Sequence, residues 1–195
     1  MSAPTKVNFK MYQGATFKEV LRWESSTKAY APITGITKAA PMVITSVAHG
    51  IPVGWRGKVT NVVGMKEVNS TEVYHTITDT AANTLTINAV NSLGFTDYTS
   101  GGVFEYNVPT SLSGKTGRMQ IRSKLEDTEV ILELTTENGG IIIDNILKTI
   151  TIVISATVSA SLTFTSAVYS LELIEGSEVT PFIYGSITLS KEITR

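Results

Sequence analysis

The stretch Val168-Tyr169-Ser170-Leu171-Glu172-Leu173 alternates apolar with polar side chains. Successive side chains of a β-strand point to opposite faces of a sheet, so this pattern is typical of a strand that buries one face. The same alternation returns in Ser186-Ile187-Thr188-Leu189-Ser190, and residues 175–181, with Gly176 and Pro181, favour a reversal between the two runs. We therefore expect two half-buried strands joined by a turn.

Further strands are expected immediately upstream. Three apolar clusters, at residues 129–134, 140–143 and 149–154, are separated by Glu137-Asn138-Gly139-Gly140 and Asp144-Asn145. Asn and Gly tolerate positive φ, so these separators indicate turns and the three strands are predicted to form a meander. Residues 155–162 are too few for a helix that stands alone and are interpreted as a connection. Residues 17–23 alternate imperfectly, which favours a strand but leaves a helix open.

The middle of the chain has a different sequence pattern. Short strand-like runs at 42–47, 58–63, 73–78 and 83–87 are punctuated by glycines, a spacing that fits a small barrel. Loop tips tolerate insertions, so a small domain placed inside a larger one explains this order. The predicted fold is all-β: a discontinuous sandwich domain of residues 1–37 and 107–195, with an inserted small β-barrel domain of residues 38–106.

Composition narrows the classes of function. The 195 residues contain no cysteine, which excludes disulfides and thiol chemistry, and we expect no metal and no cofactor. Lysine and arginine number 16 against 17 acidic residues, giving a net charge of −1, so neither nucleic acid nor a membrane surface is an expected partner. No run approaches the roughly 20 apolar residues that span a bilayer.

No arrangement of residues predicts an enzyme. The two histidines, His49 and His75, lack the spacing of a zinc site, and His49 before Gly50 is interpreted as a turn residue that bonds backbone. Gly114-Lys115-Thr116 lacks the upstream glycine of a phosphate loop, because Pro109 stands there. The carboxylates of residues 126–129 lie among basic residues and are interpreted as a solvated stretch before a strand.

Aromatic and basic residues supply the candidate interaction residues. Most aromatic rings are expected in the core, although some could form a docking or glycan-binding face. Trp55, within Val53-Gly54-Trp55-Arg56-Gly57, is predicted to lie at a loop tip. Together with Arg56 and Tyr98 it forms the predicted interaction set.

Two groups of segments carry family resemblances. Residues 44–54 (ITSVAHGIPVG), 62–69 (VVGMKEVN) and 95–102 (FTDYTSGG) look like a small β-barrel module that recurs in phage structural proteins. That module resembles the first catalytic cysteine half-domain of ubiquitin-activating enzymes, which implies a shape without ubiquitin chemistry.

The flanking segments 13–17 (QGATF), 112–122 (LSGKTGRMQIR), 168–173 (VYSLEL) and 184–187 (YGSI) are similar to immunoglobulin-like β-sandwich domains of phage tails. This chain departs from that pattern at Ser170, where an acidic residue is expected. The resemblance implies a virion protein of the tail collar, tail-fibre connector or baseplate, made in the host cytoplasm and docked in symmetric copies on other virion proteins. Two alternatives stay open: a capsid decoration protein and a host-glycan-binding module.

Overall fold

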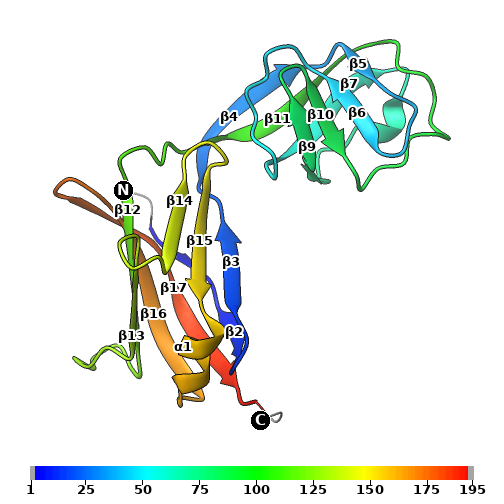
Figure 1. The fold of residues 1–195 in the computed structure, drawn as a ribbon. Coiled ribbons are helices and arrows are strands. Elements are labelled where there is room, and N and C mark those ends of the chain that lie inside the picture. The colour runs from blue at the N-terminus through cyan, green and yellow to red at the C-terminus, as the bar shows by residue number, and fades with distance from the viewer. Residues whose placement is uncertain (1–2, 193–195) are drawn as a thin grey trace. The chain divides into compact units, whose positions relative to one another are not determined.

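The computed structural model describes residues 3–192, whose regular structure is β-strand apart from one short α-helix and a 3₁₀ turn (Figure 1). The all-β prediction is therefore confirmed. The chain divides into two units, one made of Met1–Arg22 with Ser111–Arg195 and the other of Trp23–Thr110. The second unit is thus inserted into the first, and we call them the outer unit and the inserted unit.

The outer unit contains two sheets (Figure 1). The larger has six strands in the order β1 (Thr5–Lys6), β17 (Glu178–Ser190), β16 (Ser166–Glu175), β12 (Thr116–Arg122) and β13 (Leu132–Thr135), with β2 (Phe9–Tyr12) also paired to β17. The smaller has the order β14 (Ile141–Asp144), β15 (Thr149–Ile154) and β3 (Phe17–Leu21). Helix α1 (Ala156–Ser161) follows β15, and the Ser155 hydroxyl caps it by accepting from the Val158 amide.

Apolar side chains from both sheets form the core of the outer unit. The Phe9 ring on β2 packs edge-on to the Phe17 ring on β3, with centroids 5.5 Å apart, and stacks on Tyr169 of β16 at 5.2 Å. A methyl group at Gly117 of β12 would lie 2.9 Å from the Ile141 side chain of β14, so the sheets touch closely there. The two sheets therefore bury apolar side chains against each other.

The first and last parts of the chain meet at Val7. Strands β1 and β2 both run parallel to β17, and Val7 lies between them. The Val7 amide donates to the Tyr184 carbonyl at 2.8 Å, and its carbonyl accepts from the buried Tyr169 hydroxyl at 2.9 Å. A methyl group at Gly185 would lie 1.8 Å from that carbonyl oxygen, so only glycine allows this approach.

Three local expectations for the outer unit have clear outcomes. Residues 17–21 form strand β3, so the strand interpretation is confirmed. The predicted meander is wrong: β13 pairs with β12 in the large sheet, whereas β14 pairs with β15 in the small one. The chain leaves the large sheet for the small one in a turn at Asn138. The Asn138 Oδ1 stabilises this turn by accepting hydrogen bonds from the Thr135 and Gly140 amides. The reversal after β16 is shorter than expected, since β17 resumes at Glu178 and includes Pro181 beside a register shift.

The inserted unit contains two four-stranded sheets. One has the order β4 (Glu24–Pro32), β11 (Ser100–Pro109), β7 (Arg56–Val63) and β8 (His75–Thr76). The other has the order β5 (Gly35–Ile36), β6 (Met42–Thr45), β10 (Thr84–Ile87) and β9 (Asp79–Ala81). A short 3₁₀ turn, η1 (Lys66–Val68), follows β7.

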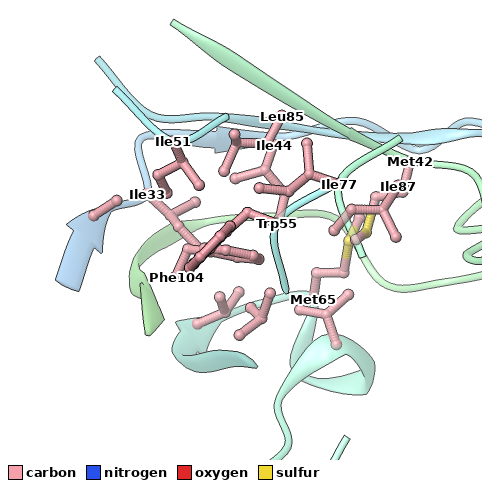
Figure 2. Close-up of a cluster of buried hydrophobic side chains, with 14 residues drawn as sticks. Ile33, Met42, Ile44, Ile51, Trp55, Met65, Ile77, Leu85, Ile87 and Phe104 are labelled. Atoms are coloured by element: carbon pink, nitrogen blue, oxygen red, sulfur yellow. The ribbon is translucent and has the colours of Figure 1, made fainter. Parts of the chain in front are cut away.

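One core joins these two sheets (Figure 2). Its members include Trp55 and Phe104 together with Met42, Ile44 and Leu85, all without solvent exposure. Sequence reasoning placed the boundaries of this unit at residues 38 and 106, whereas it runs from 23 to 110. The difference arises because β4 and β11 are paired with each other, so both belong to the insert.

Replacement of Gly185 by alanine tests the contact with Val7. The new methyl group would collide with the Val7 carbonyl, so β1 must move away from β17. We expect the free energy of unfolding to fall by at least about 2 kcal/mol, measured by urea titration. The exposed Ser170→Ala variant on the adjacent strand should stay within about 0.5 kcal/mol of the parent. Equal stability of the two variants would contradict the contact.

Candidate interaction surface of the inserted unit

The outer face of the sheet that contains β4, β11, β7 and β8 carries charged and aromatic side chains. The register places Tyr30, Glu105 and Lys58 opposite one another on three adjacent strands. Their neighbours along the strands, such as Phe104 and Val59, are buried in the core. Because side chains alternate along a strand, Tyr30, Glu105 and Lys58 share the face turned away from the core.

Arg56 organises one end of this face. Its Nε and Nη2 atoms donate to the two carboxylate oxygens of Glu24, at 2.7 and 3.1 Å, and its guanidinium lies 5.1 Å from the centre of the Tyr74 ring. The Lys58 ammonium lies 4.6 Å from the same ring. Hydrogen bonding to Glu24 raises the pKa of Arg56. The Tyr74 ring thus contacts two cations, and electrostatic attraction to the ring face favours both contacts.

A second ion pair lies on the same face. The Lys28 ammonium donates to the Glu105 carboxylate, and this hydrogen bond raises the pKa of Lys28. Tyr30 and Tyr74 remain 57% and 43% exposed although charged groups surround them. Exposed tyrosines with an arginine held by a carboxylate match the residue types that dominate protein interfaces. This set, which we call the Tyr30/Tyr74 face, is therefore a surface suited to docking another protein.

The prediction that Trp55 lies at a loop tip is wrong, because its indole has 0% exposure. Gly54 takes a positive φ of 78° just before it, and the chain there turns the side chain inward. The buried indole Nε1 donates to the Asn107 carbonyl at 2.8 Å, which satisfies its polar atom. Trp55 is consequently a core residue of the inserted unit.

The structure does not bring Trp55, Arg56 and Tyr98 together in one set of contacts. Tyr98 is half-buried against the core, and its hydroxyl lies 3.0 Å from the carbonyl oxygens of Ile33 and Gly101. Arg56 contacts Glu24 and Tyr74 instead. Of the three predicted residues, Arg56 belongs to the Tyr30/Tyr74 face.

Sequence reasoning missed most residues of this face, although part of the signal was present. Arg56 and Lys58 are two positions apart in a strand, so they must share a face. The partners Glu24 and Glu105 are distant in sequence, and only the pairing of β4 with β11 brings them close. Strand β4, with its exposed run from Ser26 to Lys28, gives no clear alternation of apolar residues.

The histidines lie away from any cluster of ligands. The His49 Nδ1 accepts from the Ile51 amide at 3.0 Å and its Nε2 lies 2.9 Å from the Ala81 carbonyl, so the interpretation of a turn residue that bonds backbone is confirmed. Within residues 3–192, no group of three or more His, Asp or Glu side chains is arranged to hold a metal ion. In the same range no helix has the length and apolar character needed to cross a bilayer.

No family model matches this chain, and a search of curated proteins finds no match.

Fluorescence tests the placement of Trp55. The chain has two tryptophans, so the Trp23→Phe variant leaves Trp55 as the only indole. Because this indole is enclosed in the core, we expect emission at a shorter wavelength than that of free tryptophan and little quenching by acrylamide. Urea should shift the emission to longer wavelength and make quenching efficient. Emission like that of free tryptophan in the native variant would place Trp55 at the surface.

His75 predicts a pH dependence of stability. Burial lowers the pKa of His75 in the folded chain below its ordinary value of 6.5. The unfolded chain therefore binds a proton at higher pH than the folded chain, so the stability is complete above about pH 7 and decreases as the pH falls through 6.5. We expect the free energy of unfolding, followed by Trp55 emission, to fall between about pH 7.5 and 5.5. The His75→Asn variant should show a shallower fall; an identical slope would exclude His75 as a cause.

Proposed function

We propose that this chain is a structural protein of a tailed-bacteriophage virion, without catalytic activity, that docks in the tail at the collar, tail-fibre connector or baseplate. The outer unit is proposed to be an immunoglobulin-like sandwich and the inserted unit a small barrel. The observation that carries the proposal is that each unit has its own apolar core, with one inserted into the other between residues 22 and 111. Such a chain can keep both units folded while each contacts a different partner.

The Tyr30/Tyr74 face supports an assembly role. Its cations and carboxylates already pair within the unit, so Arg56 and Lys58 are held in place before any partner arrives. A preorganised surface loses less conformational entropy on docking than a flexible one. Symmetric copies in a virion would repeat this contact, and the resulting avidity lowers the affinity needed at each copy.

The glycan-binding alternative loses its main support. It assigned Trp55 as the stacking platform, and this side chain is enclosed in the core. The capsid decoration alternative uses the same kind of docking surface, so location in the particle separates it from a tail protein. Gold labelling of an epitope-tagged chain on intact particles, viewed by electron microscopy, should mark the tail; label on the head would favour the decoration protein.

Mass spectrometry of purified particles is the direct test. We expect the chain in stoichiometric amounts, and its absence would overturn the proposal. The double variant Arg56→Ala, Tyr74→Ala removes the centre of the Tyr30/Tyr74 face, so its incorporation into particles should fall at least about tenfold, given that central aromatic and arginine residues contribute most to interface affinity. Lys66→Ala, which removes an exposed cation elsewhere on the same unit, should incorporate normally.

A further inference from the structure

The outer face of the six-stranded sheet contains a groove of ≈ 510 Å³, within the size range of ligand sites. Its floor follows from the strand register. Arg122, Val168 and Ser186 lie opposite one another on β12, β16 and β17, and Gln120, Ser170 and Tyr184 form the next row. Ser170 and Ser186 have shorter side chains than the other residues of these two rows. The outer face of the sheet is therefore hollow where the serines lie.

The walls of the groove come from the two sequence segments of the outer unit. Lys6 pairs with Tyr184 in register on one side, and Leu125, in the loop after β12, lines the other. The Asn8 Oδ1 accepts from the Ser186 amide and hydroxyl, each at 3.1 Å, which fixes the side chain and leaves its NH₂ group as a donor at this wall.

The groove carries positive charge without a carboxylate. Lys6 and Arg122 line it, and none of its lining residues is Asp or Glu. Arg122 is held by neutral acceptors, the Asp127 carbonyl and the Gln120 Oε1 at 2.7 Å. Within the described residues neither Lys6 nor Arg122 forms an ion pair with a carboxylate. An anionic occupant would therefore meet two cations whose charge is not already neutralised by pairing.

The apolar part of the groove narrows the chemistry of the occupant. Leu125 is 82% exposed, and it lines the same groove as half-buried Val168 and the 44% exposed Tyr184. An aliphatic side chain laid against them would remove apolar surface from water. A peptide can present carboxylates to the two cations and an aliphatic side chain to Leu125 and Val168 at the same time, so it suits this lining.

We propose that this groove binds a short acidic peptide segment of a partner protein. Its carboxylates lie against Lys6 and Arg122, and a leucine, isoleucine or aromatic side chain packs on Leu125 and Val168. The proposal does not depend on the virion role, because binding is a property of the purified chain.

Selection from a random heptapeptide display library on the immobilised full chain tests the proposal. We expect enrichment of peptides that combine at least two Asp or Glu residues with a large apolar residue. One such peptide, synthesised with a fluorophore, is then titrated with the chain by fluorescence polarisation. Its binding should weaken as salt rises, since charge pairs at a surface are screened.

Three variants locate the binding. Arg122→Gln and Lys6→Gln should each raise the Kd for the peptide about tenfold, because each removes one hydrogen bond between charged groups. Ser170→Glu puts a carboxylate into the hollow and should abolish binding. Arg118→Gln is the matched control: it removes one cation from the same strand and face, outside this groove, where Arg118 pairs with Glu172. It should leave the Kd within about threefold.

Several results would overturn the proposal. These are a selection that enriches no acidic peptides, or binding that survives Ser170→Glu and Lys6→Gln in chains whose circular dichroism melts match the parent. Lys6 is exposed, so its variant should fold even where Arg122→Gln does not. Two further results would name a different occupant and also overturn it: direct binding of acidic oligosaccharides without any peptide binding, or self-association in analytical ultracentrifugation that Ser170→Glu abolishes.

Discussion

The contact between the Val7 carbonyl and Gly185 is the constraint on which the outer unit depends. Here the first strands of the chain lie along its last strand, so a discontinuous unit becomes one sheet. The Tyr169 hydroxyl, whose pKa is raised by burial, stays protonated and donates to the same carbonyl from the core side. The Val7 carbonyl oxygen accepts from Tyr169 and lies against the Gly185 backbone. The chain therefore stays alongside β17 as it passes from β1 to β2.

The outer unit can accommodate the insertion because its first strands pair with its last strand. Residues 23–110 leave from one loop and return to it, and the amide of Thr110 donates to the Trp23 carbonyl, so the two ends of the insert are joined. The entropy cost of a long loop grows slowly with its length, and the separate core around Trp55 and Phe104 offsets it. Each unit can therefore be stable without borrowing core residues from the other.

The two proposed binding surfaces both arise from strand register. On the inserted unit, register places Glu105 between Lys58 and Tyr30; on the outer unit, it places Ser170 between Gln120 and Tyr184. The charges of the first face are paired within the inserted unit, which supports the docking role proposed for it. The groove leaves Lys6 and Arg122 without carboxylate partners among the described residues, which supports the anionic occupant proposed for it.

Local sequence pattern alone determined the all-β class, strands such as Thr149–Ile154 and the backbone-bonding role of His49, because these depend on neighbours along the chain. It also indicated an inserted unit. Residues 155–162, interpreted as a connection, instead contain helix α1, which begins after the Ser155 cap. Only the tertiary structure decided that Trp55 is enclosed, that β13 and β14 belong to different sheets, and that β4 and β11 are part of the insert. Those outcomes depend on pairing between residues far apart in sequence, such as Glu24 with Pro109, and alternation within one strand carries no information about which distant strand lies beside it.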